Sequence, residues 1–255
     1  MYRFFVAPEQ IAGEQIRITG DDVNHIKNVL RMKPGESVRI SAGSTEDYLC
    51  VIESLESQEI LLRIESKEES AVELPANIYL FQGLPKGDKM ELIIQKAVEL
   101  GARGVIPVAM KRSVVKLDAK KAASRVKRWN AISESAAKQS GRLQIPEVSM
   151  PVSFSQALAM AADFEWKILP YENAEGMEGL RSYMTQIAES VKAESKAAKP
   201  VRIGIFIGPE GGFDEKEVEQ AAETGWKSIS LGRRILRTET AGLAALSMLV
   251  YVLEP

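Results

Sequence analysis

Two strings of glycine and charged residues near the C-terminus have the composition and placement of a ligand-binding site. Gly208-Pro209-Glu210-Gly211-Gly212 follows the apolar run 201–207. The second string, Leu231 to Ala241, continues into the apolar segment 242–253. Each string lies where we expect a buried strand to end and a helix to begin, which is where α/β proteins hold ligands with backbone N–H groups and glycine. The sequence therefore predicts one pocket shared by both strings.

The residue types exclude several kinds of site. A phosphate-binding loop needs Gly-x4-Gly-Lys-Ser/Thr, and the nearest imitation, Gly83 to Met90, has the wrong spacing and no hydroxyl residue after its lysine. A dinucleotide fingerprint needs Gly-x-Gly-x-x-Gly, which neither string supplies. One histidine, His25, and one cysteine, Cys50, lie far apart and cannot make a zinc site with the usual ligand spacing. We therefore expect no metal, and an organic ligand held through backbone contacts.

The two strings closely resemble those of the SPOUT superfamily of RNA methyltransferases, which use S-adenosylmethionine. Within it they are most similar to the family that methylates N3 of a uridine in the decoding region of 16S ribosomal RNA. The resemblance covers nearly the whole chain in the same order and includes Met1–Phe5, His25–Glu36, Lys86–Lys89 and Glu134–Arg142. It implies an α/β fold with a trefoil-knotted, mostly parallel sheet and helices on both faces, preceded by a small PUA-like β-barrel. It also implies a homodimer, S-adenosylmethionine as cofactor, and 16S ribosomal RNA of the assembled small subunit as partner.

Two domains are expected along the chain. Residues 1–72 are expected to form the PUA-like barrel that grips structured RNA, and residues 73–255 the methyltransferase domain with its knot toward the C-terminus. In the first domain the pattern predicts a helix over 21–31, strands over 37–40, 48–55 and 59–64, and a charged linker over 65–74.

After residue 76 the pattern changes to alternating strands and helices. Short apolar runs predict strands over 77–82, 104–110, 166–170, 201–207 and 227–231. Helices are predicted over 90–100, 120–138, 154–162, 180–188, 215–222 and 240–253. This order favours a mostly parallel sheet covered on both faces.

The resemblance implies that three loops meet around the cofactor. The residues expected to bind it are Leu169, Pro170, Tyr171, Glu172, Ile207, Gly208, Glu210, Gly211, Gly212, Leu231, Gly232, Ile235 and Leu236. A carboxylate between glycines, as in Glu210, is costly if merely buried, and ribose hydroxyls or an amino group are natural partners for it. A strand-to-helix turn without a ligand is the alternative for the glycines, and core packing is the alternative for the apolar residues.

Two residues of the second string are the candidates for catalysis. Uridine N3 carries a proton at neutral pH, so methylation requires that proton to leave or the charge on the base to be stabilised. Arg237 is expected to stabilise charge on the uracil oxygens, and Glu239 to accept a proton or orient the arginine. The alternative is a structural ion pair between Arg237 and Glu239 at a helix start.

The charges are segregated although the net charge of the chain is only −2. Residues 111–128 hold eight basic residues and one acidic residue, whereas 53–73 hold seven acidic and two basic residues. Such runs either attract phosphate or form a solvated helix face. The residues expected to face RNA are Arg3, Arg31, Lys86, Arg112, Gln139 and Arg142.

Two other functions remain open from the sequence. One keeps the fold and cofactor and moves the acceptor to a ribose 2′-hydroxyl or to another RNA. The other is a noncatalytic RNA-binding protein of ribosome assembly, with the glycine strings as structural turns. The lone cysteine, the absence of a signal-peptide pattern and the lack of a membrane-length apolar run make us expect a cytoplasmic protein without membrane contact.

Overall fold

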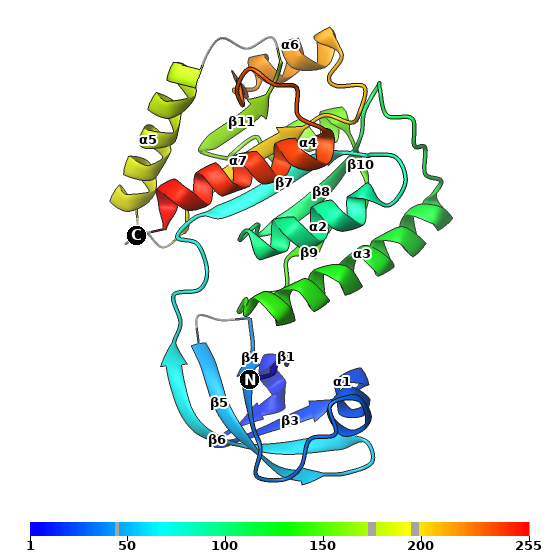
Figure 1. Ribbon diagram of the computed structural model, residues 1–255, viewed down its shortest axis with the longest axis vertical. Coiled ribbons are helices and arrows are strands. Elements are labelled where there is room, and N and C mark those ends of the chain that lie inside the picture. Colours follow the sequence, from blue (N-terminus) through cyan, green and yellow to red (C-terminus); the bar gives the residue numbers. More distant parts are fainter. Residues whose placement is uncertain (44–45, 173–176, 195–198, 255) are drawn as a thin grey trace. The chain divides into compact units, whose positions relative to one another are not determined.

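The chain folds into two compact units. The structure, a computed structural model, describes residues 1–43, 46–172, 177–194 and 199–254 (Figure 1). At 177 and 178 it describes the backbone alone. Unit 1 comprises Met1–Glu73 together with Ala137–Ile145, and unit 2 comprises Leu74–Ala136 with Pro146–Pro255. A segment from the middle of the chain thus belongs to the N-terminal unit, which the sequence did not indicate.

Unit 1 is a curled six-stranded sheet around its own core. Its strands are β1 (Arg3–Phe5), β2 (Ile11–Ala12), β3 (Gln15–Thr19), β4 (Ser37–Ser41), β5 (Glu46–Leu55) and β6 (Glu59–Glu69), in the spatial order β1-β4-β5-β6-β3-β2. All pairs are antiparallel except β1 with β4. In β3, Ile16 and Ile18 are fully buried while their neighbours are exposed, which is the alternation of a strand with one face on a core. Strand β6 continues to Glu69, so the first half of the expected linker is strand instead.

The helix expected over 21–31 is shorter and irregular. An α-helical turn, α1 (Asp21–Asn24), is followed by a π-helical segment, His25–Val29. The N–H of Leu30 donates to the carbonyl of His25 at 2.9 Å, five residues back, which widens the turn. Arg31 then has φ +54°, and it is the one non-glycine residue with positive φ among those described. Thus the periodicity locates the helix but misses its distorted end.

Unit 2 is built on a parallel seven-stranded sheet. Its strands are β7 (Asn77–Gly83), β8 (Gly104–Ala109), β9 (Glu147–Val148), β10 (Val152–Ser153), β11 (Trp166–Pro170), β12 (Arg202–Ile207) and β13 (Lys227–Ile229). The order is β10-β8-β7-β12-β11-β13, with β9 also paired to β8, and every pair is parallel. The five strands expected from the apolar runs are confirmed, and the two-residue strands β9 and β10 were not expected.

Helices cover both faces of this sheet. On one face α7 (Thr238–Leu253) packs on β12 between α2 (Lys89–Glu99) and α5 (Met177–Ala193) (Figure 1). On the other face α4 (Phe154–Met160) and α6 (Glu215–Glu223) enclose an aromatic core. Because successive strand residues point to opposite faces, Leu80 of β7 meets α7 whereas Phe81 meets the aromatic core. The two-faced arrangement expected from the sequence is therefore confirmed.

The long helix α3 (Ala119–Ser140) lies outside this three-layer arrangement. Its buried side chains include Ala122, Trp129 and Ser133, and the Ser133 hydroxyl donates to the carbonyl of Pro146. Residues 119–136 of the helix belong to unit 2, and its last turn belongs to unit 1. Among the described residues, no helix combines the length and apolarity required to cross a bilayer.

The strand order brings three loops to one edge of the sheet. Strands β7, β12, β11 and β13 are consecutive neighbours and parallel, so the segments that follow them all leave from the carboxyl edge. Counted from β7, the next strands in the sheet are β12, β11 and β13. The chain therefore forms β11 before it forms β12, which inserts between β7 and β11. The threading of a trefoil knot through these loops stays a prediction from the family resemblance.

Candidate functional site

A cavity of about 720 Å³ lies at the carboxyl edge of the unit 2 sheet. This volume is within the range of small-molecule and cofactor sites. The three loops expected from the sequence line it: the segment after β11, the glycine string after β12 and the segment between β13 and α7. Of the residues expected to bind cofactor, those on the cavity wall are Pro170, Tyr171, Glu172, Ile207, Gly208, Glu210, Gly211, Gly212, Leu231, Gly232, Ile235 and Leu236.

Leu169 does not belong to this wall. It is 1% exposed and lies in the aromatic core between the sheet and the helices α4 and α6. Its neighbour Pro170 does line the cavity, as strand alternation requires of successive residues. The side chain of Leu169 therefore packs in the core, and a contact of this residue with the cofactor stays a prediction.

The glycine string is packed too tightly for side chains at two positions. A Cβ on Gly208 would lie 3.1 Å from the backbone carbon of Gly212, so the string folds back on itself. A Cβ on Gly211 would lie 2.9 Å from Cβ of Arg112, so this glycine is required by the neighbouring segment of the protein and not by open space in the cavity. Gly212 has φ +68°, a conformation that favours glycine. The sequence of the string is thus dictated largely by its own close packing.

Glu210 is held at the cavity by the segment after β7. The backbone N–H of Lys86 donates to both carboxylate oxygens, at 3.1 and 3.3 Å, and the Lys89 ammonium lies 3.0 Å from Oε1. Partial burial alone would raise the pKa of Glu210, but the hydrogen bonds from Lys89 and from backbone N–H groups leave that pKa below its usual value of 4.5. A carboxylate therefore faces the cavity in ionised form at neutral pH.

Lys89 also reaches the candidate base Glu239. Its ammonium lies 3.2 Å from Glu239 Oε2, whose side chain is 16% exposed. The hydrogen bond to Glu210, and more weakly the one to Glu239, raise the pKa of Lys89 against the effect of desolvation. Lys89 was not among the predicted site residues, although it lies in the charged segment Lys86–Lys89 on which the family resemblance partly depends.

Thr238 fixes the start of α7 to the end of β12. Its hydroxyl donates to the carbonyl of Gly208 at 2.6 Å and accepts from Nε2 of Gln82 at 2.8 Å. Both Thr238 and Gln82 are buried, so these bonds are shielded from water. The sequence hinted at this hydrogen bond between Gln82 and Thr238, because Gln82 is a polar residue near the end of the apolar strand β7.

Arg237 is the residue just before α7, with no hydrogen bond from its side chain to the helix start. The side chain is exposed and makes no ion pair or hydrogen bond with any residue in the described part of the chain. Glu239 pairs with Lys89 instead, so the structural pair of Arg237 with Glu239 considered from the sequence is not formed. Arg233 and Arg234 are likewise exposed on the cavity wall, and Ile235 is 84% exposed between them and Arg237.

The residues expected to face RNA divide into two groups. Arg31, Lys86, Arg112 and Gln139 have exposed side chains. Arg112 also lines the cavity, and its guanidinium donates to the carbonyl of Gly211 at 3.3 Å.

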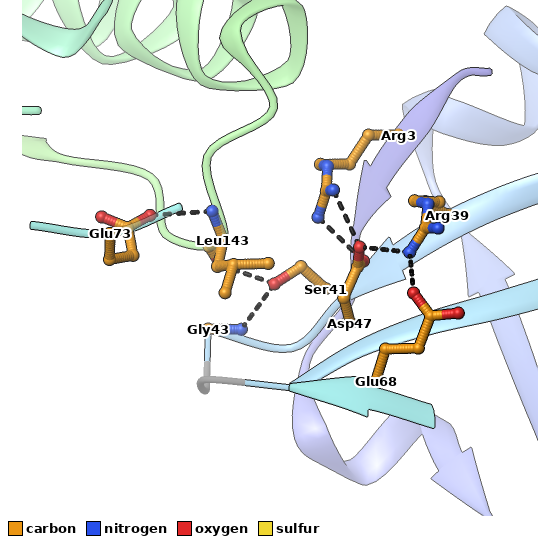
Figure 2. A network of polar contacts seen from close by, with 8 residues as sticks. All are labelled: Arg3, Arg39, Ser41, Gly43, Asp47, Glu68, Glu73 and Leu143. Atoms are coloured by element: carbon orange, nitrogen blue, oxygen red, sulfur yellow. Dashed lines mark hydrogen bonds and ion pairs between the residues drawn. The ribbon is translucent and has the colours of Figure 1, made fainter. Parts of the chain in front are cut away.

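Arg3 and Arg142 are not presented for RNA. Arg3 makes two hydrogen bonds to the carboxylate of Asp47, at 2.8 and 2.9 Å, and its side chain is 12% exposed (Figure 2). Arg142 is 3% exposed and pairs with Glu73 at 2.6 Å. Arg3 thus neutralises the buried Asp47 and Arg142 the partly exposed Glu73. That they bind phosphate stays a prediction, and these ion pairs argue against it.

The same region of unit 1 holds a continuous polar network. Asp47 also accepts a hydrogen bond from Arg39 at 2.8 Å, and Arg39 donates in turn to Glu68 at 3.0 Å (Figure 2). The hydroxyl of Ser41 donates to the carbonyl of Leu143 at 2.6 Å, and the N–H of Leu143 donates to Glu73 at 2.8 Å. These bonds attach the segment 137–145 to the sheet of unit 1.

Metal-binding geometry is not found in the described part of the chain. Within the described ranges, no three His, Cys, Asp or Glu side chains are grouped so that they could hold a metal ion. Cys50 is buried in unit 1, and burial raises the pKa of its thiol to about 12, so it behaves as a small apolar residue.

Comparisons with known proteins assign both units to families. Residues 72–250 match the RNA methyltransferase domain family, and residues 18–65 match the RNA methyltransferase PUA domain family. The chain is 39% identical over 261 residues to the ribosomal RNA small subunit methyltransferase E of Bacillus subtilis, covering 100% of this chain and 98% of the relative.

Two similar solved structures contain S-adenosylmethionine. One is a ribosomal RNA small subunit methyltransferase E from Neisseria gonorrhoeae, with a TM-score of 0.79 and 32% identity over 97% of this chain and 95% of that one. The other, from Legionella pneumophila, has a TM-score of 0.82 and 32% identity over 97% of this chain and 96% of that one.

Proposed function

The chain belongs to the ribosomal RNA small subunit methyltransferase E family of RNA methyltransferases, and from this premise we propose that it methylates N3 of a uridine in 16S ribosomal RNA. The acceptor lies in the decoding region and is recognised on the assembled small subunit in the cytoplasm. S-adenosylmethionine is the methyl donor. The single observation that carries the proposal is one cavity whose wall combines glycines, the ionised carboxylate of Glu210, Arg237 without a partner among the described residues, and Lys89, which also pairs with Glu239 behind the wall.

The residues of the cavity suit S-adenosylmethionine. The folded-back string 208–212 presents backbone rather than side chains, which allows close approach of a ligand. Glu210 is positioned to accept hydrogen bonds from ribose hydroxyls or to pair with the amino group of the methionine part. Leu231, Leu236 and Ile207 supply an apolar surface for the adenine. The cofactor, once bound, supplies an activated methyl group on a sulfonium sulfur, so the protein needs no metal to generate the electrophile.

The chain itself must deal with the proton on uridine N3. We assign Glu239 as the acceptor of that proton as the N3–carbon bond forms and the bond from sulfur to the methyl carbon breaks. Lys89, 3.2 Å away, keeps the Glu239 carboxylate next to a cation and in one orientation. Arg237, free of internal partners among the described residues, stabilises the negative charge that spreads to the uracil oxygens.

The position of the methyl group decides between this acceptor and a ribose. Reverse transcription of 16S ribosomal RNA, methylated by the purified protein on small subunits from a strain lacking the enzyme, should stop at one uridine. Methyl on N3 blocks base pairing, whereas a 2′-O-methyl group leaves pairing intact. Read-through with incorporated label would assign a ribose acceptor, and no label at all would assign a noncatalytic role.

We also propose a homodimer formed through the exposed side of α7. Thr240, Ala244, Ser247, Met248 and Tyr251 lie on one side of this helix, and Tyr251 is 85% exposed. The helix begins at the cavity, so a second copy there would lie close to the site. Ala245, by contrast, is fully buried in the same chain, so a charge at that position would disturb the core and not the interface.

Light scattering tests the dimer with a surface substitution. Tyr251→Glu should shift the protein from dimer to monomer without loss of helix content, because the side chain has no role in the core. Tyr2→Glu, at an exposed position of unit 1, is the control and should leave the mass unchanged. A wild-type monomer, or a Tyr251→Glu dimer of unchanged affinity, would contradict this interface.

A further inference from the structure

Lysines and arginines of unit 2 that lack partners form a surface leading away from the cavity. The stretch 111–128 has eight basic residues and one acidic residue, in a chain of net charge −2. It begins at Arg112 on the cavity wall, passes through the connection after β8, and continues into the first turns of α3 (Figure 1). The basic charge is therefore continuous with the candidate site.

Half of these basic residues form ion pairs with carboxylates of the same chain. Lys111 lies 2.9 Å from Asp214, Lys121 lies 3.4 Å from Asp118, and Arg128 lies 2.7 Å from Glu91. Arg112 approaches Asp214 at 3.8 Å. These four cations share three carboxylates, because Lys111 and Arg112 both approach Asp214, so their charge is partly neutralised.

The other half has no such partner. Lys116, Lys120, Arg125 and Lys127 are exposed, and their side chains make no hydrogen bond or ion pair within residues 1–43, 46–172, 177–194 and 199–254. We refer to these four residues as the basic surface. Free cations at this density repel one another, so they are most stable when an external anion lies over them.

The geometry of α3 directs this charge outward. At 3.6 residues per turn, Lys120 and Lys127 lie on the side of the helix opposite the buried Ala122 and Trp129, and the exposed Arg125 lies on the flank between the two sides. Lys120 and Lys127 are about two turns apart, which is about 10 Å along the helix axis. The exposed side of the first turns of α3 is thus a row of cations with an apolar back.

We propose that the basic surface binds the phosphate backbone of the RNA that flanks the base held in the cavity. This inference rests on the proposed function for the identity of the substrate as RNA. These contacts do not depend on the RNA sequence. The major groove of A-form RNA is too deep and narrow for side chains to reach the bases, whereas the phosphates of the RNA are accessible. Lysine and arginine on mobile side chains suit this role, since they follow a backbone rather than one fixed atom.

The test removes charge from the basic surface and measures how RNA binding depends on salt. The variant combines Lys120→Gln, Arg125→Gln and Lys127→Gln, which keeps good helix formers at exposed positions. The control combines Arg181→Gln, Lys199→Gln and Lys216→Gln, which removes the same charge from exposed positions elsewhere in unit 2. The probes are 16S ribosomal RNA transcribed in vitro and an unrelated structured RNA of equal length.

Loss of three phosphate contacts should reduce the slope of log Kd against log salt by about 2 to 3, since each contact contributes about 0.7 to 0.9. Affinity at low salt should fall on the order of tenfold or more, equally for both RNAs. The control should keep the wild-type slope. Binding of S-adenosylmethionine, and the single-turnover rate at saturating RNA, should stay at wild-type values in both variants.

An unchanged slope, or a loss no larger than that of the control, would overturn the proposal. So would a defect seen only with assembled subunits and not with free RNA, because that outcome would assign the surface to an acidic protein. The readout is binding and not methyl transfer. A protein that binds RNA through this surface but does not methylate it would refute the proposed function and leave this inference standing.

Discussion

The arginines of unit 1 and those of unit 2 carry the same charge but have different surroundings. In unit 1, Arg3, Arg39 and Arg142 each pair with a carboxylate, and Asp47 and Arg142 are almost completely buried. In unit 2, Arg237 and the basic surface have no partner among the described residues. The comparison indicates that unit 1 uses these arginines to hold itself together, while unit 2 keeps its cations available for an external anion.

The largest effect is expected from removing a buried carboxylate of unit 1. Asp47→Ala leaves Arg3 and Arg39 without the group that neutralises both, and breaking such a pair typically costs about 3–5 kcal/mol. Glu68→Ala removes only a half-exposed partner of Arg39 and should cost at most about 1 kcal/mol. Urea unfolding measures both. Equal stability of the two variants would contradict the structural role of the buried network.

Arg237→Ala should act on rate and leave stability unchanged. Loss of one preorganised donor in a closed site costs on the order of a hundred- to a thousand-fold in the chemical step. Arg237→Lys should recover little, because an ammonium lacks the planar fork of a guanidinium. Arg234→Ala, in the same exposed loop, is the control and should affect apparent RNA affinity at most.

Single-turnover rates with saturating RNA and cofactor separate the two roles for Arg237. A near-normal rate for Arg237→Ala under those conditions would make it a phosphate contact like the basic surface. In that event the charge comparison between the units would hold, but the catalytic assignment would not.

Arg31 is exposed and has no ion pair among the described residues, so within unit 1 it is the exception that sharpens the comparison. Its φ of +54° costs about 1–2 kcal/mol for a residue with a side chain, and glycine removes that cost while gaining freedom in the unfolded chain. Arg31→Gly should therefore raise the free energy of unfolding by up to about 1 kcal/mol. Arg31→Ala should not raise it.

If Arg31 keeps a strained conformation in order to bind RNA, both variants should lower the salt slope of RNA binding by about 0.7 to 0.9. A stabilised Arg31→Gly variant with an unchanged slope would show that the strained residue does not contact phosphate. Arg31 would then no longer be a candidate for RNA binding.

The smallest expected effect is on the pH dependence of S-adenosylmethionine binding. Because Lys89 keeps the pKa of Glu210 below 4.5, the pairing is complete at neutral pH and is lost only as pH falls through that lowered value. Binding of S-adenosylmethionine should weaken over the same acid range. In Lys89→Gln the pKa of Glu210 rises, so the loss should begin at higher pH.

Lys86→Gln is the matched control for this acid effect. It removes an equal charge from the same segment but keeps the backbone N–H that donates to Glu210. Calorimetric titrations between about pH 3.5 and 6 should therefore match wild type for this control. Coincident profiles for all three proteins would exclude Glu210 from cofactor binding.

Much of unit 2 was predictable from the sequence because its strands are apolar runs bounded by charged helices. The exceptions, β9 and β10, are two residues long and leave no periodic signal. In unit 1, strand β3 was not predicted, although polar and apolar residues alternate in Gln15-Ile16-Arg17-Ile18-Thr19 as they do in a half-buried strand. The π-helical segment was not predictable, since it depends on packing rather than on residue spacing.

The candidate site was predictable only where it is local in sequence. The glycine string and the 231–241 string contain their own turns and could be identified directly. Lys89 and Gln82 were missed because their partners Glu210 and Thr238 lie more than a hundred residues away. The ion pairs of Arg3 and Arg142 could not be predicted, because the sequence does not show which arginines lie against a carboxylate in the fold.

The division of unit 1 into Met1–Glu73 and Ala137–Ile145 has a consequence for biosynthesis. The N-terminal sheet leaves the ribosome well before the segment that supplies Arg142 to Glu73 and Leu143 to Ser41. At 5–20 residues per second this interval is roughly 4–15 s. During it, Glu73 lacks Arg142 and Ser41 lacks the carbonyl of Leu143, while β7, α2 and β8 of the second unit are already emerging. Unit 1 is still the first unit whose residues are all synthesised, but its folding has to wait for the segment that follows the end of α3.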